Sequence, residues 1–230
     1  MFLKGEIMTN FVVALDGPAG SGKSSISKLV ADKFGFTHID TGAMYRAVTL
    51  EALRRKININ NEDEYGFLNE TQVIYLKDKV YLNDVDVTKE IRKPNVTNAV
   101  STCCKFKTVR EYLVKFQRDS AANGQVIMDG RDIGTVVLPN ANLKIFLTAS
   151  PEVRAKRRYD EIMAKGGQVE YDVILEEIKV RDYKDSTREI SPLKQAQDAI
   201  LIDTSYLTID EVVEKISKLI IERLEENGKF

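Results

Sequence analysis

The sequence predicts an α/β fold in which helices cover both faces of a mostly parallel sheet, and two patterns carry this prediction. The first is a set of short apolar runs with the length and composition of buried strands: Phe11–Leu15, Phe36–Ile39, Val126–Met128, Leu143–Leu147 and Ala199–Ile202. The second is helical periodicity between most of these runs. Strands that alternate with helices predict a doubly wound sheet, and such sheets bind ligands at the carboxyl ends of their strands.

Three helices can be placed from their apolar spacing and their ends. After Lys23, apolar side chains recur at helical spacing until Gly35 stops the pattern. A second helix is predicted after Thr41. A third is predicted after Thr208, which has the spacing of a capping box with Glu211. Each of these helices follows a predicted strand directly, as a doubly wound fold requires.

The segment from Val73 to Val87 breaks the alternation of strands and helices. It has the pattern of strand, turn and strand twice, with polar turns at 77–79 and 83–84. We therefore expect a small antiparallel sheet within an insertion over residues 60–101. No internal repeat, low-complexity tract or Pro/Gly-rich linker divides the chain, so residues 1–230 are expected to form a single domain.

Composition and charge exclude several classes of protein. The chain has 230 residues, with 34 Lys and Arg against 35 Asp and Glu, and a net charge of −1. A nucleic-acid coat or a membrane-surface protein needs a basic excess that this chain lacks. No apolar run approaches the ~20 residues of a membrane span. We expect a cytoplasmic protein with no nucleic-acid or membrane partner, in which any phosphate site comes from local clustering of arginines.

Cysteine and histidine are too few for a zinc site or a His-based triad. Cys103 and Cys104 are adjacent, which rarely allows a disulfide, so two reduced thiols are expected. His38 is the only histidine, and its apolar surroundings favour a core or strand residue over a ligand. Met8 is a second candidate start, because the first predicted strand begins only at Phe11.

A glycine-rich motif follows the first predicted strand. It matches G-x-x-x-x-G-K-[ST] at every fixed position, and its residues are Gly17, Pro18, Ala19, Gly20, Ser21, Gly22, Lys23, Ser24 and Ser25. Glycines let the backbone turn its N–H groups toward phosphate oxygens, and the following helix offers its positive N-terminus. Lys23 is expected to reach the β- and γ-phosphates, and the Ser24 hydroxyl to bind Mg²⁺. The motif predicts a nucleoside triphosphate site.

Arginines decide which kind of nucleotide protein this is. The guanine signature Asn-Lys-x-Asp is absent, which argues against a GTPase. Four arginines follow predicted strands or end helices: Arg46, Arg131, Arg181 and Arg188. An enzyme that joins two phosphorylated substrates must offset the repulsion between them, and the planar guanidinium is best suited to this. The basic run Arg154–Arg158 fits the same purpose, although Asp160 and Glu161 follow it and a solvated helix face would look alike.

Four motifs together resemble those of the bacterial-type cytidylate kinase family. They are Asp16-Gly17-Pro18; Asp40-Thr41-Gly42-Ala43-Met44-Tyr45-Arg46; Asp129-Gly130-Arg131-Asp132-Ile133-Gly134-Thr135-Val136-Val137; and Arg181-Asp182-x-x-Asp185-x-x-Arg188. The resemblance runs from about Phe11 to Leu224. The departures are the seven residues before Met8, and Thr41 where Ser is also common in the family. The resemblance implies a P-loop nucleoside monophosphate kinase fold with five parallel strands, an antiparallel insertion and a helical lid.

The resemblance also implies roles for matching residues. It implies an acceptor site in which Arg46, Arg131 and Arg188 hold the monophosphate, with Thr41 beside it. It implies that Ser101, Arg110 and Asp132 contact the cytosine, and Arg181 and Asp185 the ribose. From the residues alone, Ser101 and Arg110 would be a loop cap and a surface charge. It further implies that Arg157 and Arg158 belong to a lid over ATP, and that Asp129 holds Mg²⁺ through water.

The implied division places the core at 11–59, 102–153 and 191–230, the monophosphate-binding insertion at 60–101 and the lid at 154–190. The implied substrates are ATP and CMP or dCMP, and the chain is expected to be a monomer. Two alternatives remain open at this point. One is another small-molecule P-loop kinase, acting on UMP, GMP or shikimate. The other is a non-catalytic ATP-binding switch, which the second arginine cluster disfavours because a switch needs no second phosphate site.

Overall fold

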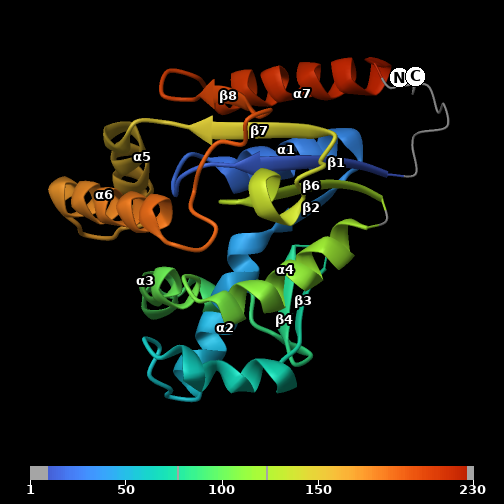
Figure 1. Ribbon diagram of the computed structural model, residues 1–230. Coiled ribbons are helices and arrows are strands. Elements are labelled where there is room, and N and C mark those ends of the chain that lie inside the picture. Colours follow the sequence, from blue (N-terminus) through green and yellow to red (C-terminus); the bar gives the residue numbers. More distant parts are fainter. Residues whose placement is uncertain (1–9, 77, 123, 227–230) are drawn as a thin grey trace.

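The main sheet has five parallel strands in the order β2-β6-β1-β7-β8 (Figure 1). Its strands are β1 (Asn10–Asp16), β2 (Thr37–Asp40), β6 (Gly124–Gly130), β7 (Leu143–Thr148) and β8 (Ile200–Asp203). The computed structural model describes residues 10–76, 78–122 and 124–226. All five predicted strands are confirmed to within three residues at each end, and the candidate start at Met8 lies outside the described residues.

The described part of the chain contains seven α-helices. They are α1 (Lys23–Phe34), α2 (Thr41–Arg54), α3 (Pro94–Cys103), α4 (Lys107–Ala121), α5 (Pro151–Ala164), α6 (Tyr171–Thr187) and α7 (Ile209–Glu226). Gly35 ends α1 in the left-handed region, at φ 71°, where glycine has no Cβ penalty. The capping box of α7 is confirmed, because Glu211 N donates to Thr208 Oγ1 and Glu211 Oε2 accepts from Thr208 N.

Alternate residues of the central strands feed two separate cores. Phe11, Val13 and Leu15 of β1 pack with α1 and α7 on one face of the sheet. Ala14 of β1 and Met128 of β6 belong to the core on the other face, which includes residues of α2 and α4. This alternation is the period of a pleated strand covered on both sides.

The antiparallel insertion packs below the main sheet in Figure 1, together with α2 and α4. It contains β3 (Val73–Leu76), β4 (Lys79–Leu82) and β5 (Val85–Asp86), so the predicted meander is confirmed. Short helices flank it: the 3₁₀ helices η1 (Glu62–Glu70) and η2 (Glu90–Arg92). The expected boundary at residue 101 falls inside α3. Helices α5 and α6 pack on each other around Ala155, Ile174 and Ile178, at the edge where β1 and β7 end.

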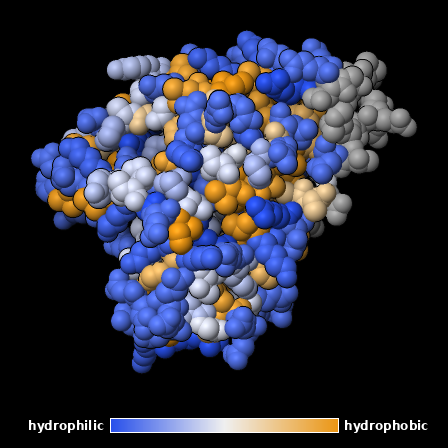
Figure 2. Space-filling model, viewed as in Figure 1, coloured by the Kyte–Doolittle hydropathy of each residue, from blue (hydrophilic) through white to orange (hydrophobic). Residues whose placement is uncertain are grey.

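Polar side chains cover most of the visible surface, including the insertion and the α5–α6 pair (Figure 2). Among the described helices, none combines the length and the apolar character that crossing a membrane would require. The carboxyl ends of β1, β2 and β6 meet at one edge, and the insertion and the α5–α6 pair border that edge from two sides (Figure 1).

Candidate active site

The glycine-rich loop turns tightly between β1 and α1. Gly20 and Gly22 have φ angles of 77° and 87°, in the left-handed region that favours glycine. At Gly17, a Cβ would lie 1.9 Å from the carbonyl oxygen of Leu147 on β7, so only glycine fits there. The loop shape therefore depends on glycine at the positions that the motif specifies.

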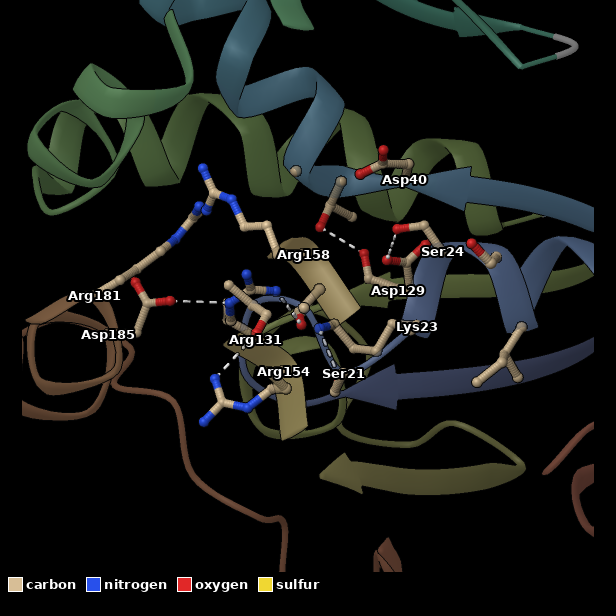
Figure 3. A pocket seen from close by; sticks show the side chains of 18 of the residues that line it. Ser21, Lys23, Ser24, Asp40, Asp129, Arg131, Arg154, Arg158, Arg181 and Asp185 are labelled. Atoms are coloured by element: carbon tan, nitrogen blue, oxygen red, sulfur yellow. Dashed lines mark hydrogen bonds and ion pairs between the residues drawn. The ribbon is translucent and has the colours of Figure 1, made fainter. Parts of the chain in front are cut away.

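Lys23 lies at the start of α1 and is buried within the loop. Its Nζ donates to the carbonyl oxygen of Pro18 at 2.6 Å and to Ser21 Oγ at 3.3 Å. Burial, and next the charge of Arg131, lowers the pKa of Lys23 well below its usual range. An anion in the loop would favour the charged ammonium again. The ammonium group of Lys23 therefore lies within the loop, where we expect a phosphate to bind (Figure 3).

Two side chains whose oxygen atoms are suited to binding Mg²⁺ lie in contact beside the loop. Ser24 Oγ donates to Asp129 Oδ2 at 2.8 Å, and Asp129 ends the buried strand β6. Hydroxyl and carboxylate oxygens fit this hard cation, which takes few protein ligands when it is bound to substrate phosphates. No cluster of three or more His, Cys, Asp or Glu residues able to hold a metal occurs among the described residues. The donor set therefore fits Mg²⁺ that arrives with a nucleotide.

The neighbours of Asp129 fix its position. His38 of β2 pairs its Nε2 with Asp129 Oδ1 at 2.7 Å, and the Thr41 hydroxyl donates to the Asp129 carbonyl oxygen at 2.8 Å. His38 is thus a half-buried strand residue, and its place in a strand is as predicted, but it also has a polar role that the apolar surroundings did not indicate. Although burial opposes it, the bond to Asp129 raises the pKa of His38 above its usual value.

On the other side of the edge, carboxylates hold the arginines in place. Arg131 Nε donates to Asp185 Oδ2 at 3.0 Å, and the buried Arg110 pairs with Asp132. Arg188 Nη2 lies 3.8 Å from Asp132 Oδ1, so one carboxylate faces two guanidinium groups. These residues come from α4, α6 and the turns after β6 and α6, which the fold brings together.

A fourth pair closes the group at the start of α2. Arg46 Nη2 donates to Asp40 Oδ2 at 2.9 Å, while Asp40 Oδ1 caps the helix by accepting from Ala43 N. Asp40 therefore fixes the helix start and the arginine together.

Several N–H groups of the arginines at this edge donate no hydrogen bond within the described part of the chain. Four buried guanidinium nitrogens have no hydrogen-bond partner among the described residues: Arg46 Nε, Arg110 Nε, Arg181 Nε and Arg188 Nη2. Burial, and next the neighbouring charge of Arg131, lowers the pKa of Arg181 to about 10. Buried donors without partners are costly, and crowded positive charge is relieved by an anion. Both features indicate a site for a phosphorylated ligand.

The basic side chains of the run Arg154–Arg158 on α5 lie in different environments. Arg154 is buried and donates to the Ala19 carbonyl oxygen at 3.0 Å and to both oxygens of Asp182 on α6, so it links the phosphate loop to the α5–α6 pair. Arg157 donates to the Thr204 carbonyl oxygen at 2.6 Å. Arg158 lies 3.7 Å from Glu177. Lys156 is exposed and pairs with Asp160, which is the solvated helix face that the sequence also allowed.

One cleft of about 790 Å³ joins these parts. In Figure 3, Lys23, Ser24 and Asp129 lie on one side of it, and Arg131, Arg154, Arg181 and Asp185 lie on the other. Every residue proposed from the sequence for the site lines this cleft except Gly17 and Pro18, which form the base of the loop. Ser101 is brought in by α3 and Arg110 by α4.

Sequence reasoning missed several residues that line the cleft: Asp40, Tyr45, Arg92, Thr204, Leu207, Ile209 and Val212. Tyr45 is buried with its ring 5.3 Å from the Arg110 guanidinium carbon and with a hydroxyl that has no partner among the described residues. Asp40 and Tyr45 stand in a motif quoted from the sequence, which was the available signal. Thr204 and Leu207 follow the fifth strand without a motif to mark them.

Asp16, at the end of β1, was also missed as a structural link. Its carboxylate accepts from the backbone N–H groups of Ile133 at 2.8 Å and Gly134 at 2.7 Å. These N–H groups begin the π-helical turn η3 (Ile133–Val137), directly after Asp132. Burial raises the pKa of Asp16 to about 6. Asp16 therefore ties the base of the phosphate loop to the turn that carries Asp132.

Fold and cleft together define a P-loop nucleotide-binding protein with a second, arginine-lined anion site. Comparison with known proteins identifies the family. The family model for cytidylate kinase matches residues 13–222. A cytidylate kinase from Acholeplasma laidlawii is 53% identical over 213 residues, covering 93% of this chain and 96% of the relative. One from Clostridium tetani is 54% identical over 210 residues, covering 91% and 93%. The chain belongs to the cytidylate kinase family.

A solved structure supports the fold. An uncharacterized protein from Eubacterium ventriosum superposes with a TM-score of 0.52 at 15% identity, covering 92% of this chain and 98% of that one. At this identity the likeness concerns the fold alone.

Proposed function

We propose that this chain transfers the γ-phosphoryl group of ATP to CMP or dCMP, giving ADP and CDP or dCDP. The observation that carries the proposal is the cleft that joins the phosphate loop to a group of arginines, in which four buried guanidinium nitrogens have no hydrogen-bond partner among the described residues. A reaction between two phosphorylated substrates needs two adjacent anion sites, and a purely regulatory nucleotide switch needs one. Membership of the cytidylate kinase family supports cytosine as the base.

On the donor side, the loop from Gly17 to Ser25 would hold the ATP phosphates by its backbone N–H groups, and Lys23 would contact the β- and γ-phosphates. Ser24 and Asp129 would hold Mg²⁺, the latter through water. When bound, Mg²⁺ neutralises charge between the phosphates. Arg157 and Arg158, on α5 beside the cleft, would close over ATP and contribute positive charge at the transferring group.

On the acceptor side, Arg46, Arg131 and Arg188 would bind the monophosphate, with Thr41 beside it. Their partners Asp40, Asp185 and Asp132 hold the guanidinium groups in position before the substrate arrives. Arg181 and Asp185 would contact the ribose. Preorganised arginines need no rearrangement in the transition state, which is where electrostatic catalysis gains most.

Base recognition would fall to Ser101, Arg110 and Asp132. Cytosine presents an amino donor at position 4 and an acceptor at N3, whereas uracil presents the reverse. The Asp132 carboxylate can accept from the amino group, and Arg110 and the Ser101 hydroxyl can donate to the ring nitrogen and carbonyl. The Arg110–Asp132 pair is buried, so a uracil base would leave polar groups unpaired out of water.

The chemistry then requires positioning more than proton transfer. The CMP phosphate is already an anionic oxygen nucleophile, so no general base is needed. Its oxygen attacks the γ-phosphorus in line with the leaving ADP oxygen, while Lys23 and the arginines stabilise the charge on the transferring group. Closing the α5–α6 pair over the cleft would exclude water, which otherwise would hydrolyse ATP.

The protein is further proposed to work as a monomer in the cytoplasm, without nucleic-acid partners. Balanced charge, 34 basic against 35 acidic residues, supports the absence of nucleic-acid binding. Two free cysteines fit a reducing compartment. Size-exclusion chromatography with light scattering tests the monomer directly.

The experiment that tests the proposed activity is ADP release from ATP with CMP, dCMP, UMP, AMP, GMP and shikimate as separate acceptors. CMP and dCMP should stimulate ADP release far above the rate without acceptor. A chain that prefers another acceptor would be a different P-loop kinase, and one that responds to none would be a nucleotide-binding switch.

A further inference from the structure

The insertion reaches the metal side of the cleft as well as the acceptor side. The turn between β3 and β4 places Asp78 against the core, where its Oδ2 accepts from Lys28 Nζ of α1 at 2.5 Å. Asp78 has φ 60°, a left-handed conformation that aspartate tolerates better than most side chains. The tip of the hairpin therefore lies on the helix that begins at the phosphate loop.

The same carboxylate faces the ring of His38. Asp78 Oδ1 lies 3.6 Å from His38 Nδ1, and this nitrogen is buried with no hydrogen-bond partner within range among the described residues. Tyr75 of β3 meets the His38 ring edge-on, with ring centroids 6.3 Å apart. Two residues of the insertion thus enclose a side chain of β2.

The other ring nitrogen of His38 determines how Asp129 is turned. Nε2 pairs with Asp129 Oδ1 at 2.7 Å, which leaves Oδ2 for Ser24 Oγ at 2.8 Å. A carboxylate bonded at one oxygen has little freedom to rotate, so its second oxygen stays aimed at the loop. Both the neutral ring protonated at Nε2 and the imidazolium can donate the bond to Asp129, whereas the Asp78 carboxylate, which only accepts, attracts Nδ1 when that nitrogen also carries a proton.

We propose that His38 is a positioning residue that orients Asp129 toward the metal site, and that the β3–β4 hairpin holds His38 through Asp78. This inference rests on the proposed role of Asp129 in holding Mg²⁺. Groups that orient metal-binding carboxylates affect metal affinity by about 10- to 100-fold when removed. The insertion would then contribute to metal binding at a distance, besides carrying acceptor residues.

The test measures metal binding directly. Mn²⁺ is titrated by electron paramagnetic resonance into the protein saturated with the non-hydrolysable analogue AMP-PNP, for wild type, His38→Leu, His38→Gln and Asp129→Ala. We expect His38→Leu to weaken Mn²⁺ binding about 10-fold or more. His38→Gln should recover most of the loss, because its amide nitrogen can reach the position of Nε2. In kinetics, the Mg²⁺ concentration for half-maximal rate should rise with His38→Leu, while the KM for CMP stays near the wild-type value.

Asp78→Asn tests the link to the hairpin. It should weaken Mn²⁺ binding by about 2- to 5-fold and have no further effect in the His38→Leu background, since residues acting through one another are not additive. Asp86→Asn is the matched control: its side chain is 41% exposed against 44% for Asp78, and it pairs with Lys79 in the same small sheet without touching His38. It should leave Mn²⁺ binding unchanged.

The outcomes separate two failures. If Asp129→Ala weakens Mn²⁺ binding but His38→Leu does not, the positioning role is overturned and the proposed metal site stands. If Asp129→Ala itself has no effect, the proposed metal role of Asp129 fails and the inference fails with it. If circular dichroism shows that His38→Leu does not fold, Mn²⁺ binding by Asp78→Asn tests the proposal instead. A loss of Mn²⁺ affinity no larger than that of Asp86→Asn then overturns the proposal.

Discussion

The two sides of the cleft are built in different ways. The donor side is built around one continuous loop whose shape comes from glycine conformations and from bonds within the loop, such as that of Lys23 to the Pro18 carbonyl oxygen. The acceptor side is assembled from residues far apart in the chain. Its arginines are held by ion pairs with carboxylates, as Arg131 is by Asp185, 54 residues further along the chain.

This difference explains how each side meets its ligand. A backbone loop offers N–H groups at fixed spacing, which suits any polyphosphate and reads little else. An arginine held by a carboxylate keeps its remaining nitrogens for the substrate. We expect the substrate to bind at the buried guanidinium nitrogens that have no hydrogen-bond partner among the described residues. We therefore expect the donor side to accept nucleoside triphosphates with little discrimination, and the acceptor side to select the nucleotide that receives the phosphoryl group.

The largest expected effect comes from breaking the donor side at Lys23. Lys23→Ala should lower kcat on the order of 10³-fold, equivalent to about 4 kcal/mol at the transition state, because the ammonium acts on the transferring phosphates. The free energy of unfolding should change much less than that. Lys33→Ala, an exposed lysine in the last turn of the same helix, is the control and should keep wild-type kcat. A folded Lys23→Ala variant with near-normal turnover would remove the loop from the mechanism.

Base choice is the next effect and belongs to the acceptor side. Asp132→Asn keeps the size of the side chain but replaces one acceptor oxygen with a donor. The ratio of kcat/KM for CMP to that for UMP should fall on the order of 10- to 100-fold, since hydrogen-bonded sites discriminate more strongly than shape alone. The ratio is the readout because Asp132 also holds Arg110 and Arg188, and loosening them should slow both substrates alike. A ratio that stays at the wild-type value would show that Asp132 does not read the base.

Arg188→Met should have a smaller effect that stays on the acceptor side. Loss of one charged contact to the monophosphate should lower kcat/KM for CMP by about 10- to 100-fold, through a higher KM and a lower kcat. ATP affinity, measured by calorimetry without CMP, should change by less than about 3-fold on the same reasoning. Equal losses for both nucleotides would place Arg188 on the lid side of the cleft instead.

Sequence reasoning alone pointed to the phosphate loop and to Arg46, Arg131, Arg181 and Arg188, whereas Ser101, Arg110 and Asp132 were added only through the family resemblance. The loop is contiguous, so its spacing is visible in the chain. At the two glycines that the motif fixes, a Cβ would clash at Gly17 and φ is positive at Gly22. No spacing could show that Arg110 meets Asp132, because their contact depends on how α4 packs beside the turn after β6. The central strands β1, β6 and β7 could be predicted because burial on both faces leaves a continuous apolar run.

The polar links between elements were the part that the sequence concealed. His38 looks like a core residue because its neighbours are apolar, and its contact with Asp129 arises only when β2 and β6 pair. Arg154 looked like a member of an exposed basic run, yet it is buried between the phosphate loop and Asp182. Long-range pairs of this kind carry no local pattern, so a structure is needed to see them.

Asp16 connects the two sides, and its titration gives the smallest predicted effect. The carboxylate is buried and its pKa is raised to about 6, whereas a carboxyl group in the unfolded chain titrates near its ordinary value of 3.8. Between these values the folded state holds a proton that the unfolded state has released. The folded state therefore gains stability from this group as the pH falls through 6, and loses it as the pH rises.

Asp16→Asn removes that titration and keeps a side chain of similar size. The free energy of unfolding of the wild type, taken relative to Asp16→Asn, should be about 1 kcal/mol more favourable to folding at pH 5 than at pH 8. Other titrating groups are common to both proteins and cancel in the difference, so urea unfolding at the two pH values isolates Asp16. At pH 8 the variant should also show a higher KM for CMP with little change for ATP. The amide nitrogen that replaces one carboxylate oxygen cannot accept from Ile133 N or Gly134 N, so the turn after Asp132 loosens. If the free energy of unfolding differs between wild type and Asp16→Asn by the same amount at both pH values, Asp16 titrates at its ordinary pKa. If the KM for CMP is unchanged in the variant, the acceptor side keeps its shape without this link.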